Sequence, residues 1–117
     1  MGRVTSILIY PEKDEPGQSL DVSFVSEEGL DGDRRKKSPV HLVVVADYVD
    51  QHPRANLVVD LDRDELDALV GRRLQIGTVQ LDVASAAGTC PGVYASVPVP
   101  GDVTVGDVVT VGIPDGP

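Results

Sequence analysis

The chain has 117 residues, with 19 acidic and 10 basic side chains and a formal charge of −9. This negative charge disfavours binding to nucleic acid and to anionic membranes, and the length suits one domain, residues 1–117, whose core needs no disulfide or metal. The single cysteine excludes an internal disulfide, and no apolar run has the length of a signal-peptide core or a membrane span. These features predict a cytoplasmic protein, in which a lone thiol can stay reduced.

Aliphatic and β-branched residues dominate the apolar positions of the N-terminal half, which favours strands. Residues 4–10 predict a first strand, which Pro11 ends. The alternation around Leu20, Val22 and Phe24 predicts a second strand with these three side chains on its buried face. Residues 27–39 are too rich in glycine and charge for a core element, whereas the apolar run 40–46 predicts a central strand.

The C-terminal half predicts one clear helix among further strands. Asp47 is a plausible N-cap for a short helical turn over 47–51, and Asp62 with Glu65 resembles a capping box for a helix that ends near Gly71. The predicted strands are 56–60, 72–76, 78–85, 93–99 and 103–112, with Gly77 in a turn. The pattern therefore predicts a mostly β fold, a closed or nearly closed β-barrel with one or two short helices.

Cys90 lies in the loop sequence GTCPG, residues 88–92. Only the thiolate is a good nucleophile and soft-metal ligand, and small neighbours would let a bulky ligand approach it. The alternative is a buried cysteine that acts as a small hydrophobic residue. The residues alone leave both interpretations open.

A basic run, Arg34 to Lys37, interrupts the acidic chain and could grip an anionic ligand such as a phosphate. A solvated loop that balances neighbouring carboxylates is the alternative. His41 lies in an apolar strand, where it is either a packed imidazole at the edge of the core or part of the same pocket. His41 and His52 with one cysteine are too few for a standard zinc site, and the sequence DLDRDELD lacks the glycine and glutamate positions of a calcium loop.

Six segments in this order resemble the molybdenum cofactor sulfurase C-terminal (MOSC) domain in a minimal, stand-alone form. They are GLDGDRR, VHLVVVA, ANLVVDLD, LVGRRLQIGTVQLDVAS, GTCPGVYASV and GDVTVGDVVTV, and together they cover nearly the whole chain. The fold of that family is a mostly β-barrel, in agreement with the predicted strands.

The resemblance implies a role with the molybdenum cofactor (molybdopterin), a small-molecule pterin dithiolene that carries a phosphate. Cys90 takes the position of the family cysteine, proposed either to carry sulfur as a persulfide from a pyridoxal-phosphate cysteine desulfurase or to ligate molybdenum. In the second role, family members with a redox partner reduce N-hydroxylated compounds. The pterin phosphate would suit Arg34 or Arg35.

By position, Gly29, Gly32, Asp33 and Arg34 match the family's glycine-rich acidic and basic loop, and Asn56 matches the asparagine of its NL element. The predicted cofactor-binding residues are Gly32, Asp33, Arg34, Arg35, His41, Asn56 and Thr89, with Cys90 as the catalytic residue and metal ligand. The competing hypothesis is a non-catalytic β-barrel module that binds an anionic ligand through the Arg34 to Lys37 loop, with Cys90 structural.

Overall fold

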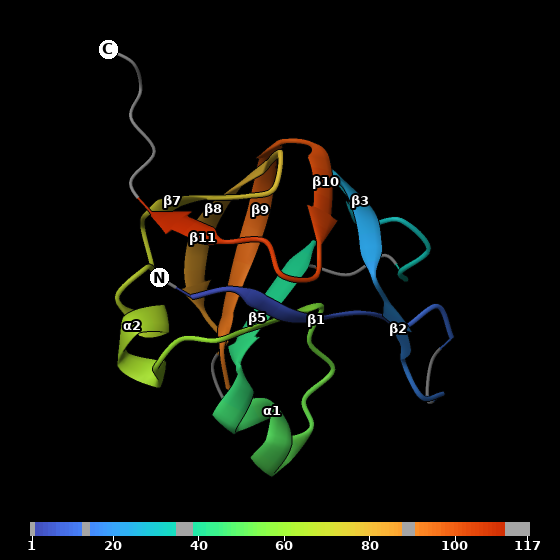
Figure 1. Ribbon diagram of the computed structural model, residues 1–117, viewed down its shortest axis with the longest axis horizontal. Helices are drawn as coiled ribbons and strands as arrows, with labels where there is room; N and C mark the ends of the chain where they lie inside the picture. Colours follow the sequence, from blue (N-terminus) through green and yellow to red (C-terminus); the bar gives the residue numbers. More distant parts are fainter. Residues whose placement is uncertain (1, 13–14, 35–38, 88–90, 112–117) are drawn as a thin grey trace.

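The chain forms two β-sheets and two short helices in a computed structural model that describes residues 2–12, 15–34, 39–87 and 91–111 (Figure 1). The helices are α1 (Val45–Gln51) and α2 (Arg63–Asp67). The strands are β1 (Val4–Ile9), β2 (Gln18–Leu20), β3 (Val22–Ser26), β4 (Gly29–Leu30), β5 (Val40–Val44), β6 (Leu57–Val59), β7 (Arg73–Ile76), β8 (Val79–Ala86), β9 (Val93–Val99), β10 (Gly101–Thr104) and β11 (Val109–Val111). The mostly β fold class is therefore confirmed.

The larger sheet has the strand order β11-β7-β8-β9-β5-β6-β1-β2. β5 and β6 run parallel and are joined through α1, while the other pairs of this sheet are antiparallel. A parallel pair needs a crossover connection, which here contains the helix. β5 is buried at every position, as its continuous apolar run predicted for a central strand.

This sheet curls but does not close into a complete barrel, so the closed form of the predicted barrel is wrong. A single isolated bridge, Arg3 to Val108, brings the β11 end of the sheet to the start of β1. β2 pairs with the later part of that strand, at Ile7 to Ile9. The contact between β1 and the β11 end is therefore confined to the start of β1, before the residues that pair with β2.

The second sheet has the order β10-β3-β4 and corrects two sequence predictions. In β3 the exposed side chains are Val22 and Phe24, at 54% and 48%, whereas Ser23 and Val25 are buried. The chain breaks at Asp21 between β2 and β3, and a shift of one residue exchanges the two faces of a strand. Similarly, the predicted strand 103–112 divides into β10 and β11, because a turn at 105–106 separates them.

The core between these elements is aliphatic. Its fully buried side chains include Leu and Ile residues from most of the large sheet, such as Ile7, Leu42, Leu57, Leu74, Ile76 and Leu81. The alternation of β7 and β8 around Gly77, which has φ of 60°, follows the sequence prediction. Burial of this many apolar side chains, at about 25 cal/mol per Å², is the main term that stabilises the sheet.

The two helices pack at one end of the molecule, in the lower part of Figure 1. α2 begins with the predicted capping box, in which Glu65 accepts a hydrogen bond from the Asp62 amide at 2.9 Å. α1 starts earlier than predicted, after Val44, so the assignment of Asp47 as N-cap is wrong. Asp47 is instead buried inside α1 and forms an ion pair with Arg63 of α2, which fixes the two helices relative to each other.

Candidate functional site

Asn56, the residue before β6, lies where three segments of the chain meet. Its side chain is fully buried. Its Oδ1 atom accepts a hydrogen bond from the His41 amide at 3.1 Å, and its Nδ2 group donates to the Leu8 carbonyl at 3.2 Å and to Asp33 Oδ2 at 3.0 Å. Its backbone also bonds to Leu8 and His41. One amide side chain therefore ties β1, β5 and the loop after β4 together.

Asp33 ends the tight turn that follows β4. Its amide donates to the Leu30 carbonyl at 3.1 Å, and Gly32 inside this turn has φ of 85°, a left-handed conformation that glycine adopts without strain. Among the described residues, the carboxylate accepts a hydrogen bond from the Tyr10 amide at 2.7 Å through Oδ1 and one from Asn56 through Oδ2. Two donors on its two oxygens hold this carboxylate in one orientation.

His41 extends the same network toward the cysteine loop. Its buried ring forms a hydrogen bond between Nε2 and the Pro91 carbonyl at 2.8 Å, with Nε2–H as the donor, because a carbonyl can only accept. The ring also packs against Tyr94, with centroids 4.9 Å apart. A Cβ at Gly92 would clash with the Leu42 carbonyl oxygen, so this position needs glycine for the segment to lie against β5.

Four of the predicted site residues thus come together. Gly32 lies in the turn, and Asp33, Asn56 and His41 form the hydrogen-bonded network, which continues to Pro91. Arg34 follows Asp33 and is exposed. The remaining predicted residues, Arg35, Thr89 and Cys90, lie outside the described residues. Whether any of them contacts a cofactor stays a prediction.

Sequence reasoning missed the backbone partners of this network. The Tyr10 amide, the Leu8 carbonyl and the Pro91 carbonyl each complete one of its hydrogen bonds. Every residue carries a backbone carbonyl and every residue except proline an amide N–H, so no side chain marks them in the sequence. Only Pro91 had a signal, because it follows Cys90 in the GTCPG loop.

A pocket of about 220 Å³ opens beside the Asp33 turn. Its described lining is acidic because it includes Glu28, Asp31 and Asp33. The other described lining residues are Ser26, Gly29, Leu30 and Gly32. The nearby carboxylates disfavour an anion inside this pocket.

Tyr10 borders the network on its other side. Arg54 stacks over the Tyr10 ring, 4.4 Å from its centroid, and donates to the carbonyls of Glu12 and Glu15. Burial, followed by the charge of Tyr48, raises the pKa of Tyr10 to about 12, and Arg54 opposes this shift. The stacking with Arg54 holds the ring of Tyr10, the residue whose backbone amide bonds to Asp33.

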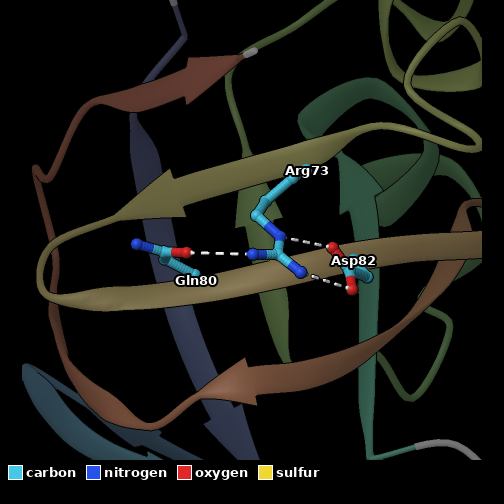
Figure 2. Close-up of polar contacts among 3 residues, drawn as sticks. All are labelled: Arg73, Gln80 and Asp82. Carbon is cyan, nitrogen blue, oxygen red and sulfur yellow. Dashed lines mark hydrogen bonds and ion pairs between the residues drawn. The ribbon is translucent and has the colours of Figure 1, made fainter. Parts of the chain in front are cut away.

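A second polar cluster lies away from this site, on the β7–β8 hairpin (Figure 2). Arg73 Nε and Nη2 donate to the two oxygens of Asp82 at 2.7 and 3.1 Å. The hydrogen bond from Arg73 holds the pKa of Asp82 below its ordinary value of 3.8, although partial burial opposes this. Both side chains are over 40% exposed, so the pair stabilises the hairpin weakly and offers no enclosed site.

The described residues contain neither a metal-binding cluster nor a membrane-spanning helix. No group of three or more His, Cys, Asp and Glu side chains in ranges 2–12, 15–34, 39–87 and 91–111 is arranged to hold a metal ion. Within the same ranges, neither helix is long and apolar enough to cross a membrane.

Solved structures share this architecture at low sequence identity. YuaD from Bacillus subtilis matches with a TM-score of 0.73 and 16% identity, over 95% of this chain and 96% of that chain. YiiM from Geobacillus stearothermophilus matches with a TM-score of 0.71 and 13% identity, over 97% of this chain and 76% of that chain. YiiM from Escherichia coli gives 0.70 and 15%, over 96% and 70%.

These likenesses show the fold alone. No protein-family model matches the sequence, and no curated protein matches it. The fold of this chain, mostly β with one parallel strand pair and two short helices, is MOSC-like, in agreement with the sequence resemblance.

Proposed function

We propose that this MOSC-like domain carries sulfur or binds the molybdenum cofactor through Cys90. The observation that supports the proposal is the hydrogen-bonded path from Asp33 through Asn56 and His41 to Pro91. It joins the turn that carries Arg34 to the residue that follows Cys90 in the sequence. Two segments that the MOSC resemblance assigns to one site are therefore tied to each other in the fold.

The chemistry of the available donors fits the molybdenum cofactor in a specific way. Molybdenum binds soft sulfur donors, which a ligand with its own sulfur atoms and one thiolate from the chain can provide together. The dithiolene of molybdopterin is such a ligand, and Cys90 would supply the thiolate. Arg34 and Arg35 would hold the phosphate, and Gly32 and Thr89 would border the pterin. When bound, the cofactor would supply redox chemistry, with electrons delivered by a partner protein.

In the sulfur-carrier role, the donor is a persulfide on a pyridoxal-phosphate cysteine desulfurase. The Cys90 thiolate attacks the terminal, sulfane sulfur of the donor R–S–SH, which forms Cys90–S–SH and releases R–S⁻ as the leaving group. The sulfur–sulfur bond of the donor breaks as the new one forms, and the terminal proton stays with the transferred sulfur. No external oxidant or reductant is needed.

His41 and Asn56, both predicted from the sequence to bind the cofactor, have a different role in this proposal. His41 Nε2 is bonded to Pro91, and the Asn56 amide is buried and bonded to Asp33, Leu8 and His41. We propose that they hold the surrounding chain segments in place without touching the ligand, while Arg34 and Cys90 contact it.

The test compares wild type with Cys90→Ser, in which a hydroxyl replaces the thiol at nearly constant volume. Both proteins are purified from a molybdate-supplied host and assayed for molybdenum per chain. They are then incubated with a cysteine desulfurase and cysteine and assayed for cyanide-labile sulfur. Molybdenum or labile sulfur near one per chain in wild type, and below about a tenth of that in the variant, would support the proposal.

Arg34→Glu in the same assays separates the two ligand contacts. If Cys90 is the acceptor, this variant should still take up sulfur while retaining less molybdenum. If wild type takes up neither sulfur nor molybdenum, or Cys90→Ser takes up as much as wild type, the proposal is wrong. An anionic ligand that binds Cys90→Ser normally and Arg34→Glu weakly would then indicate a non-catalytic binding module.

A further inference from the structure

We infer that Asn56 and His41 are positioning residues that couple the Asp33 turn to the chain segment that starts at Pro91. In this arrangement the two sides of the site do not move independently. The inference rests on the proposed function, because it matters for the site only if Arg34 and Cys90 contact the same ligand. It can be tested without any ligand.

The first step of the argument is that Asn56 has little freedom. Within the described part of the chain, its side chain makes hydrogen bonds to three separate segments, and it is fully buried. Asn56 has two donor hydrogens and one acceptor oxygen that can accept twice, so these contacts use both donors and one acceptor position. Any displacement of the Asp33 carboxylate therefore leaves a buried amide hydrogen without its acceptor, which is costly.

The second step is that His41 transmits this constraint. The His41 backbone amide donates to Asn56 Oδ1, and the His41 carbonyl accepts a hydrogen bond from the backbone amide of Asn56. Asn56 therefore sets the backbone position of His41. Its ring then bonds to the Pro91 carbonyl at 2.8 Å. Gly92, the next residue, accepts a hydrogen bond from the Ala87 amide at 3.0 Å. Exchange of the Ala87 amide therefore reports on the Pro91 end of the path, and both Ala87 and Gly92 are described residues.

Asp33 and Asp31 provide a matched comparison on the same turn. Asp33 accepts hydrogen bonds from Tyr10 and Asn56, whereas Asp31 is exposed. Replacing either aspartate by asparagine removes one negative charge. At position 33 it also presents an amide with one acceptor oxygen to two donors, so one donor loses its partner.

The experiment is hydrogen exchange measured by NMR on the ligand-free full chain, read at the Ala87 amide. Asp33→Asn should accelerate exchange of this amide about threefold or more relative to wild type, while Asp31→Asn should leave it unchanged. The Val83 amide in β8, bonded to the Arg72 carbonyl at 3.0 Å, serves as the control for global unfolding. Val83 exchange reports any loss of global stability, so in Asp33→Asn the acceleration at Ala87 should exceed the acceleration at Val83.

A second pair of variants tests His41. His41→Leu removes the donor to Pro91 and should accelerate Ala87 exchange about fivefold or more, whereas His41→Gln keeps an amide donor at similar reach and should restore most of the protection. His52→Leu, at the exposed C-cap of α1, is the matched control and should change nothing at Ala87. The alkylation rate of Cys90 by iodoacetamide should change in His41→Leu and return within about twofold of wild type in His41→Gln.

Two results would overturn the inference: Asp33→Asn indistinguishable from Asp31→Asn at Ala87, or His41→Gln no better than His41→Leu. If His41→Leu fails to fold, Asp33→Asn and His41→Gln still decide the question. The sulfur and molybdenum assays of Cys90→Ser are independent of these exchange measurements. The coupling can therefore fail while the proposed function holds, and the reverse outcome is equally visible.

Discussion

Two regions of the molecule hold a carboxylate with nitrogen donors, and they do so in opposite environments. On the β7–β8 hairpin, Asp82 is 44% exposed and its partner Arg73 is 42% exposed, on neighbouring strands nine residues apart (Figure 2). At the candidate site, Asp33 is bonded to the buried Asn56, 23 residues away. The first carboxylate can exchange its partner for water, whereas the second is tied to a group that water does not reach.

This difference indicates which contacts can set the geometry of a site. An exposed pair competes with solvent and salt, so its net contribution to the free energy of unfolding is small. A buried amide that loses its partners pays the full cost of desolvation. The path from Asp33 to Pro91 therefore has the larger energetic consequence, although its groups are mostly neutral.

The largest effect is expected for Asn56→Ala. The change leaves the His41 amide and the Leu8 carbonyl without their side-chain partners and removes one donor from Asp33. We expect the free energy of unfolding to fall by about 3 kcal/mol, as measured by urea denaturation.

Gln80→Ala is the matched control for this prediction. Gln80 also carries an amide, but on the hairpin surface, where it accepts from Arg73 Nη1 at 3.5 Å. Its loss should cost under about 0.5 kcal/mol. Equal costs for the two variants would show that burial of the Asn56 amide does not matter as argued.

An intermediate effect is expected for Tyr10, which lies at the border between the buried network and solvent. Its pKa is raised to about 12, chiefly by burial and then by Tyr48. Between pH 10 and 12 the unfolded chain has released the phenol proton that the folded protein keeps. Unfolding then releases a proton, so stability falls as the pH rises through this window.

Urea unfolding at several alkaline pH values checks this prediction, together with a titration of the phenolate absorbance. Tyr10→Phe should show a shallower loss of stability over the same pH window, because its side chain has no proton to release. Parallel profiles for wild type and Tyr10→Phe would contradict it.

The elements that could be predicted from the sequence are those with a local pattern. Three such elements each depend only on residues close together in the sequence. They are the apolar run of β5, the alternation of β7 and β8 around Gly77, and the Asp62–Glu65 capping box. The face of β3 was predicted wrongly because a break at Asp21 changed its register, and nothing local marks that break as different from a polar position in a longer strand.

The candidate site shows the same division between local and distant information. The family resemblance identified Asp33 and Asn56 as site residues, and the sequence itself offered His41 as a candidate for the same pocket. The structure brings the three together. Their bonds to one another depend on the position of β1 and on the parallel pairing of β5 with β6. His41 and Pro91 are 50 residues apart in the sequence, so no spacing rule indicates that a ring nitrogen meets that carbonyl.

The smallest effect is expected for the hairpin pair itself. The Arg73 hydrogen bond lowers the pKa of Asp82 below 3.8, so the pair's contribution is present above that pH and is lost as the pH falls. Asp82→Asn keeps one acceptor for the guanidinium, and because solvent screens both groups, it should cost less than about 1 kcal/mol at neutral pH.

Salt sharpens this comparison with the buried network. High salt should shrink the difference between Asp82→Asn and wild type in urea unfolding, because it screens an exposed ion pair. The cost of Asn56→Ala should stay the same, since its groups are buried and mostly uncharged. A salt-independent cost for Asp82→Asn, as large as that of Asn56→Ala, would mean that Arg73 and Asp82 are held as rigidly as the buried path.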